Sequence, residues 1–101
     1  MDDLNAITCV VQRGMANEIV AAALSSGASG ATYYQGQGTG TRQKLGEILS
    51  ELIIPEKDII NVIVSDDNLD EVFAAIVEAG NLEKKGRGIA YSYKIDKAVG
   101  V

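Results

Sequence analysis

The sequence lacks several residue types on which common protein chemistry depends. Its 101 residues include no histidine, no tryptophan and a single cysteine, Cys9. Without histidine the chain has neither the usual general base nor the commonest metal ligand. One cysteine excludes an internal disulfide and every CxxC metal or redox motif. We therefore expect no metal site, and we expect Cys9 to be a buried hydrophobic residue rather than a nucleophile.

Positive charge is also scarce. The 9 Lys and Arg residues are outnumbered by 14 Asp and Glu, which gives a net charge of −5. This balance argues against a surface that binds nucleic acid. No apolar run approaches the roughly 18 residues of a membrane span, and Met1-Asp2-Asp3 is acidic where a secretory signal is basic. We expect a cytoplasmic protein with no nucleic-acid partner and no direct membrane insertion.

The most prominent feature that is present is an internal repeat. The segment 17–24, NEIVAAAL, is echoed by the segment 70–77, DEVFAAIV. An apolar run of β type precedes each one, at 7–11 and 59–64, and a glycine-bearing break and another strand candidate follow. The pattern is that of a βαβ unit written twice. At 47% hydrophobic and 23% charged residues, the chain is expected to form one domain over residues 1–101.

Both repeated segments carry apolar residues at helical spacing. In the second segment they are Leu69, Val72, Phe73, Ile76 and Val77, and in the first they are Ile19, Val20, Ala23 and Leu24. Asp66 or Asp67 is positioned to cap the second helix, and Gly27 is positioned to end the first. The last strand alternates strictly, which predicts one buried side lined by Ile89, Tyr91, Tyr93 and Ile95.

Two βαβ halves of this length predict an α+β fold. The simplest arrangement is a ferredoxin-like βαββαβ sandwich, a four-stranded antiparallel sheet with two helices on one face. The first and third strands offer apolar residues to both faces of the sheet, but the helices cover only one face. Each large apolar side chain contributes about 1.5–3 kcal/mol when it is fully buried, so leaving several in water would forfeit much of a small domain's stability. We therefore expect a closed homo-oligomer.

Two glycine-bearing loops hold most of the positive charge. They are the segment 36–44, GQGTGTRQK, between the halves, and the segment 84–88, KKGRG, before the last strand. Five of the nine basic residues lie in them: Arg42, Lys44, Lys84, Lys85 and Arg87. Glycine N–H groups, threonine hydroxyls and basic side chains together suit a phosphate. The alternative is that the glycines only turn the chain, since neither loop matches the Walker motif.

These loops carry a resemblance to a known family. The order of elements, Gly38-Thr39-Gly40 followed by Arg42-Gln43-Lys44, and Gly86-Arg87-Gly88 before the last strand resemble the PII signalling superfamily over nearly the whole chain. The short, non-uridylylated PII-like branch is more similar than the classical nitrogen regulators. The resemblance implies a homotrimer that binds AMP, ADP or ATP between subunits, with Mg²⁺ as an accompanying ion. It also implies that a T-loop, here 36–58, and a B-loop, here 82–88, relay nucleotide state to a regulated transporter or enzyme.

Position by position, the resemblance assigns the site. Of the predicted nucleotide-binding residues, the resemblance implies Thr32, Gly38, Gly40, Arg42, Ile63, Gly86 and Gly88, and the hydroxyl and basic groups of the two loops add Thr39, Lys85 and Arg87. Gln43 and Lys57 are implied contacts to a small anion such as 2-oxoglutarate or to Mg²⁺. Arg87 and Ile89 depart from the aspartate and lysine of the classical B-loop, so a preference for triphosphate does not carry over. The connection 36–58 holds no tyrosine to accept a nucleotidyl group.

The connection also contains an apolar stripe at helical spacing. Its members are Leu45, Ile48, Leu49, Leu52 and Ile53. Gly46 lies within the stripe and costs a helix about 1 kcal/mol relative to alanine, which makes this helix marginal. We expect Leu45, Ile48, Leu49 and Leu52 to contact a partner protein, and the alternative is permanent docking on the chain's own oligomer.

Three functions compete at this point. The first is a non-enzymatic nucleotide sensor in nitrogen regulation or a related signalling process. The second is a small nucleotide or acyl-phosphate hydrolase that holds phosphate with Arg42 or Arg87, although a catalytic base is lacking. The third is a structural or metal-handling oligomer, which the missing histidines disfavour. The four tyrosines Tyr33, Tyr34, Tyr91 and Tyr93 are expected in the core or in subunit contacts, because an RNA-binding sheet needs basic surroundings.

Overall fold

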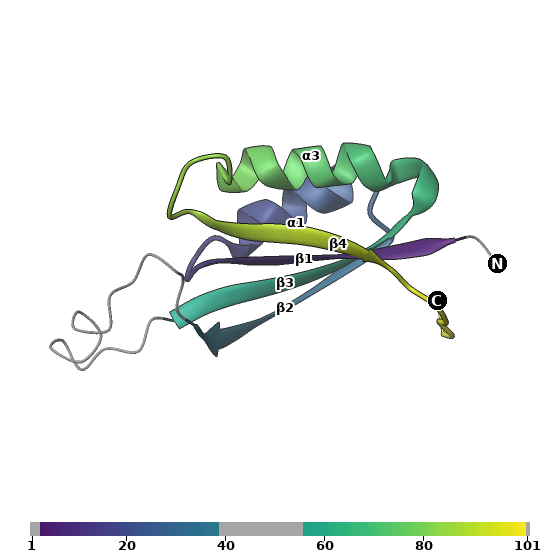
Figure 1. The fold of residues 1–101 in the computed structure, drawn as a ribbon, viewed down its shortest axis with the longest axis horizontal. Coiled ribbons are helices and arrows are strands. Elements are labelled where there is room, and N and C mark those ends of the chain that lie inside the picture. The colour runs from purple at the N-terminus through teal and green to yellow at the C-terminus, as the bar shows by residue number, and fades with distance from the viewer. Residues whose placement is uncertain (1–2, 39–55, 101) are drawn as a thin grey trace, which may run out of the picture.

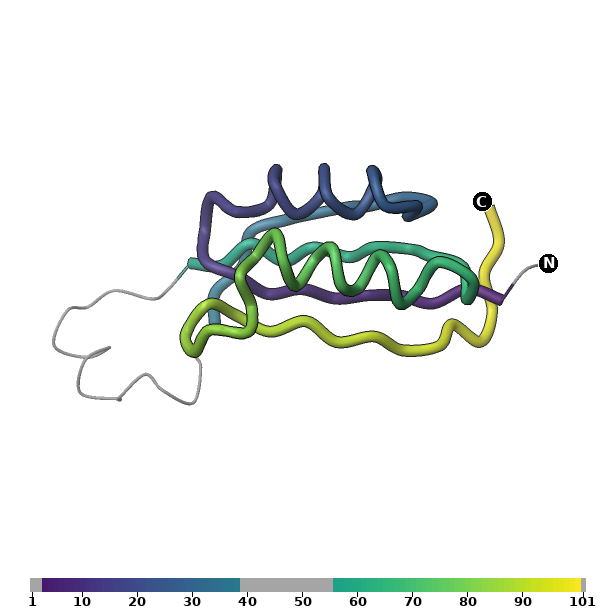
Figure 2. Tube along the Cα trace, turned by 90° about the horizontal axis from the view of Figure 1, so that it is seen from above, coloured from purple at the N-terminus to yellow at the C-terminus, as the bar shows by residue number. Residues whose placement is uncertain are grey.

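The computed structural model describes residues 3–38 and 56–100. Along the chain the elements are β1 (Leu4–Gln12), α1 (Ala16–Ser25), β2 (Gly30–Gln37), β3 (Glu56–Ser65), the 3₁₀ turn η1 (Asp66–Asn68), α3 (Leu69–Gly80) and β4 (Gly88–Lys94). The sheet order is β2-β3-β1-β4, and every neighbouring pair is antiparallel. Both helices lie on the same face of the sheet (Figures 1 and 2). The predicted ferredoxin-like βαββαβ arrangement is confirmed.

The core lies between the helices and one face of the sheet, which we call the covered face. Alternate residues of the two central strands point into it: Ile7, Cys9 and Val11 from β1, and Ile60, Val62 and Val64 from β3. The repeated helices meet them with Ile19, Ala23, Val72 and Ile76, all fully buried. Cys9 is completely buried as expected, and desolvation raises the pKa of its thiol to about 11. A thiol in that state is a packing group and not a nucleophile.

The helix ends follow local signals, with one correction. The predicted stop at Gly27 is confirmed, because Gly27 has φ +118° and the next amide, Ala28 N–H, donates to Ala23 O at 3.0 Å. Asn81 ends α3 in the same left-handed way. The predicted cap at Asp66 or Asp67 is wrong: no side chain caps η1 or α3. Asp66 instead accepts hydrogen bonds from Asn5 and Lys94, and so ties the start of β1 to the end of β4.

The opposite face of the sheet, which we call the open face, has no helix over it. Strand register places Val10, Tyr34, Ile59, Ile63, Ile89, Tyr91 and Tyr93 there. The prediction of a buried side on the last strand is therefore wrong for the single chain, since Ile89 is 57% exposed and Tyr93 is 51% exposed. The strand pattern identified which side chains share a face but not whether anything covers that face. Leu24 of the first predicted stripe is also exposed.

The connection between β2 and β3 is shorter in sequence than the predicted range 36–58. β2 continues through Gln37 and β3 begins at Glu56, so both ends of that span are paired strand.

Among the helices within 3–38 and 56–100, none is long and apolar enough to cross a membrane.

Candidate functional site

One end of the sheet collects the segments that the sequence singled out. β1 and β2 end there, and β3 and β4 begin there (Figure 1). We call this the loop end and define it by residues 12–15, 36–38, 56–58 and 81–88. Six of the predicted site residues lie at the loop end: Gly38, Lys57, Lys85, Gly86, Arg87 and Gly88.

The loop end is basic in an otherwise acidic chain. Of the seven basic residues that the structure describes, five lie there: Arg13, Lys57, Lys84, Lys85 and Arg87. Three acidic residues share the same segments, namely Glu56, Asp58 and Glu83. Glu56 is paired with Arg13. Fold topology therefore gathers positive charge that is dispersed along the sequence, and such a patch attracts anions.

The two glycines of the predicted B-loop are required for different reasons. Gly88 has φ +141°, and a Cβ there would lie 2.3 Å from Val10 O on the neighbouring strand. Only glycine fits at that close approach between β4 and β1. Gly86 also has a positive φ of +84°, but a Cβ there would meet nothing within 4 Å. Gly88 thus has a packing reason that is independent of any ligand, whereas Gly86 leaves open space above the turn.

Arg87 lies between these glycines and is held only weakly. Its Nε donates to Gly80 O at 3.4 Å, and a terminal nitrogen lies 3.8 Å from Met15 Sδ. Both contacts are long, and no acidic side chain pairs with Arg87 among the described residues. The guanidinium is therefore half-buried against the C-terminus of α3 and the β1–α1 turn while its charge is not neutralised by a carboxylate.

Lys57 lies at the base of the connection on the open face. Strand register sets it opposite Gly36 of β2 and Gln12 of β1. A Cβ at Gly38 would lie 3.8 Å from Lys57 Cγ, so the end of β2 runs close along the lysine stem. The structure therefore brings Gly38 and Lys57 close together.

Thr32 and Ile63 are not at the loop end. Both point to the open face, where Thr32 lies opposite Asn61 and Ile63 lies opposite Ala6. Ile63 is six residues from Lys57 along β3, a distance of roughly 20 Å in a strand. Within one chain, Ile63 and Lys57 are therefore too far apart to contact the same small group directly, and Thr32 lies about 13 Å along the sheet from Lys57.

The remaining predicted site residues lie outside the described residues. They are Thr39, Gly40, Arg42 and Gln43 from the glycine-bearing segment, and Leu45, Ile48, Leu49 and Leu52 from the apolar stripe. Within 3–38 and 56–100, no group of three His, Cys, Asp or Glu side chains is arranged to hold a metal ion.

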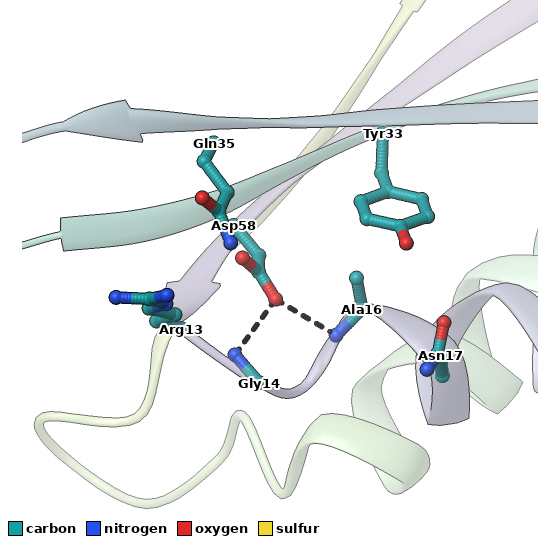
Figure 3. Close-up of a pocket in the computed structure, with 7 residues that line it drawn as sticks. All are labelled: Arg13, Gly14, Ala16, Asn17, Tyr33, Gln35 and Asp58. Atoms are coloured by element: carbon teal, nitrogen blue, oxygen red, sulfur yellow. Dashed lines mark hydrogen bonds between the residues drawn. The ribbon is translucent and has the colours of Figure 1, made fainter.

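A buried carboxylate at the loop end was missed by the sequence analysis. Asp58 is only 3% exposed and lines a cavity of about 210 Å³ (Figure 3). A signal for it was present in the sequence, since Asp58 occupies the same alternating positions of the strand as Ile60, Val62 and Val64. An acidic residue at a core-facing position of a strand indicates a specific polar contact.

These features define a class of protein: a ferredoxin-like α+β domain whose loops gather basic residues at one end of the sheet. Solved structures share this fold. A Bacillus cereus protein related to NIF3 matches 95% of this chain at 20% identity with a TM-score of 0.75, and this chain spans 26% of that protein. The Arabidopsis thaliana PII protein bound to citrate matches 93% of this chain at 18% identity with a TM-score of 0.69, and 78% of that chain is covered.

The family model of nitrogen regulatory protein P-II matches residues 4–101, and the chain therefore belongs to this family of signal transduction proteins. A search of curated proteins gives no match.

Proposed function

We propose that the chain is a nucleotide-responsive signalling protein. In this proposal, three copies form a homotrimer, bind an adenine nucleotide (AMP, ADP or ATP) in the crevices between subunits, and signal its presence to a regulated protein through the connection 36–58. Membership of the P-II family supports the class. The observation that carries the proposal for this chain is the concentration of basic residues at the loop end, beside the open turn at Gly86.

The positions of Thr32 and Ile63 support a site shared between copies. Both lie on the open face: Thr32 is paired with Asn61, about 13 Å along the sheet from Lys57, and Ile63 lies roughly 20 Å from it, so in this proposal a neighbouring copy supplies them to the nucleotide. The same face leaves Ile89, Tyr91 and Tyr93 about half exposed, and a neighbouring copy packed there would bury them. One arrangement thus accounts for the exposed apolar face and for the separation of the predicted contacts.

Arg87 is the residue on which the proposal depends most within the described part of the chain. Its contacts to Gly80 and Met15 are weak, so a phosphate oxygen would be a stronger partner for the guanidinium. Lys85 and the N–H groups around Gly86 lie in the same turn. The amphipathic stripe 45–53 remains our prediction for the surface that contacts the regulated protein, for which a membrane transporter or a metabolic enzyme are the candidates.

Calorimetry tests this proposal. The affinity is measured for AMP, ADP, ATP, cyclic AMP and S-adenosylmethionine, each with and without Mg²⁺, to identify the preferred ligand. Citrate is added to test for a general anion site. We expect Arg87→Ala to weaken nucleotide binding roughly tenfold to hundredfold, the range for a hydrogen bond to a charged group. Lys97→Ala is the matched control, because Lys97 lies beyond β4 at the far end of the sheet. Equal affinities in the two variants would remove Arg87 from the site.

Two further outcomes separate the alternatives. Trimers that bind no adenylate at millimolar concentration would contradict the proposed nucleotide binding, and only the proposed homotrimer would stand. Steady phosphate release from ATP, lost in Arg42→Ala, would favour the hydrolase over the sensor.

A further inference from the structure

The carboxylate of Asp58 has two oxygens with different surroundings. Oδ2 accepts hydrogen bonds from Gly14 N–H at 2.9 Å and from Ala16 N–H at 3.1 Å. These contacts join β3 to the β1–α1 turn and satisfy N–H groups where α1 begins (Figure 3). One oxygen is sufficient for this structural task. The second oxygen therefore has to be explained separately.

Oδ1 is buried and has no hydrogen-bond partner within the described part of the chain. Leaving a buried polar atom without a partner is costly, and more so for a charged group. Gln35 is directly opposite Asp58 on β2, and its amide lies beside the carboxylate in Figure 3, yet no hydrogen bond joins them. Arg13 extends away from the carboxylate in the same view and pairs with Glu56.

The cavity around Asp58 is larger than one water molecule needs. Its volume is about 210 Å³, against roughly 10–15 Å³ for a single water. The Tyr33 ring stands at one side of it and the Asn17 amide at another (Figure 3). Tyr33, Gln35 and Asn17 are exposed, so the cavity is reached from solvent on the helix side of edge strand β2. A small organic group can enter the cavity, and it reaches the buried Oδ1 when a lining side chain such as that of Gln35 rotates aside.

The lining selects a cationic donor. A carboxylate oxygen without a donor repels anions and forms its strongest hydrogen bonds with a charged N–H group. The Tyr33 ring on the opposite side of the cavity favours a cation further, because the ring face carries negative charge (Figure 3). The amide side chains of Asn17 and Gln35 add neutral donors and acceptors. An anion or a purely apolar molecule would leave Oδ1 without a partner.

We propose that the Asp58 cavity binds the primary ammonium group of an aliphatic amine, with Asp58 Oδ1 as the acceptor and the Tyr33 ring as the adjoining wall. The ammonium group belongs either to a free small amine or to a lysine side chain of a partner protein. The cavity lies on the covered side of the sheet, whereas Thr32 and Ile63 lie on the open face. The proposal therefore does not depend on nucleotide binding.

Amide NMR of the full chain provides a local test. Propylammonium chloride is titrated into the protein at constant ionic strength, and the Gly14 and Ala16 amide signals are followed, because both amides contact the same carboxylate. We expect saturable shifts of these two signals. We expect Asp58→Asn, which keeps an oxygen for both amides, to weaken binding roughly tenfold to hundredfold. Tyr33→Leu should weaken it about twofold to fivefold.

Matched controls make the test decisive. Asp67→Asn removes one exposed acidic charge in η1 at the far end of the sheet and should leave the affinity unchanged. Neutral 1-propanol, titrated into the unmodified protein, tests the charge without any substitution. Shifts of equal size with propanol, equal affinity in Asp58→Asn, or no saturation would each overturn the proposal. Tighter binding of Nα-acetyl-lysine N-methylamide than of propylammonium would assign the group to a protein side chain, and the reverse would assign it to a free amine.

Discussion

The two faces of the sheet are built from the same strands but end in opposite environments. On the covered face Ile60 and Val62 are completely buried beneath the helices. On the open face Tyr34 is 54% exposed and Ile89 is 57% exposed. The open face also carries polar residues such as Thr8, Asn61 and Lys57, but most of its large side chains are apolar or aromatic, so composition alone does not explain the difference. The covered face holds the chain together, and the open face is apolar surface that the single chain leaves in water.

Strand β4 shows the difference most clearly. It lies at the edge of the sheet next to β1 and contributes only Ala90 to the packing of the core. Its larger side chains point to the open face, where the rings of Tyr91 and Tyr93 stack with their centroids 6.4 Å apart. A contiguous apolar surface of this kind is typical of an interface between proteins. The covered face therefore stabilises the single chain, and in the proposed trimer the open face is the surface that a neighbouring copy would bury.

Substitutions at two adjacent isoleucines of β3 test this division directly. Ile60 points to the covered face and Ile59 to the open face. We expect Ile60→Ala to lower the free energy of unfolding by about 2–5 kcal/mol at every protein concentration, because it leaves a cavity in the core. Ile59→Ala should cost less in dilute protein, and its cost should grow with concentration as association buries the site. Denaturant titrations at several concentrations measure both effects, and equal losses at all concentrations would contradict the division.

A charge on the open face should separate assembly from folding. We expect Ile89→Lys to weaken self-association by about 1.5–3 kcal/mol per contact, roughly tenfold to hundredfold, while the circular dichroism of the chain is retained. Ala74→Lys, on the exposed side of α3, is the matched control. Sedimentation equilibrium gives the masses. A trimer that is as stable in the Ile89→Lys variant as in the unmodified chain would show that the subunits meet elsewhere.

The start of β4 offers a smaller test of how the open face is held in place. Gly88→Ala should lower the free energy of unfolding by about 1–3 kcal/mol, because its Cβ would lie 2.3 Å from Val10 O at a positive φ. Gly86→Ala is the control in the same turn, with open space around the added carbon, and should cost about 1 kcal/mol. Thermal denaturation ranks the two. The reverse order would mean that β4 adjusts freely against β1.

The smallest expected effect is at the other end of β4, where Lys94 contacts Asp66. The hydrogen bond from Lys94 Nζ, at 2.8 Å, is the main cause that lowers the pKa of Asp66 below its ordinary 3.8, and Asn5 adds to it. The same contact raises the pKa of Lys94 above 10.5. Asp66 therefore stabilises the fold above pH 3.8, and this contribution is lost as the pH falls through its lowered pKa. The contribution of Lys94 is present below pH 10.5 and is lost as the pH rises through its raised pKa.

Urea denaturation over a pH series checks this contact. Asp66→Asn should slightly reduce the loss in the free energy of unfolding at low pH and at high pH. The effect is small because Asp66 and Lys94 are exposed and solvent screens their interaction. Asp67→Asn, next in the chain and without such a contact, should leave the profile unchanged. Identical profiles in the two variants would show that the contact contributes nothing measurable.

Much of the fold was predictable because it follows from periodicity. Helical spacing placed Val72 and Ile76 in the core, and alternation along β3 placed Ile60, Val62 and Val64 on one face. The role of Asp66 was not predictable, because its partners Asn5 and Lys94 are distant in the sequence and become neighbours only through strand pairing. Of the candidate site, the sequence identified Lys57, Gly86 and Arg87. It did not identify the cavity at Asp58, whose walls come from the β1–α1 turn, α1, β2 and β3.

The order and type of the elements, the covered-face residues and the basic glycine loops were determined by the sequence alone, because spacing and local composition are properties of neighbouring residues. Only the tertiary structure decided that the described ends of these loops meet at one end of the sheet, that Ile63 lies roughly 20 Å from Lys57, and that Asp58 Oδ1 is buried beside a cavity. These facts depend on strand order and on which face the helices cover. Both are set by contacts between residues that are far apart along the chain.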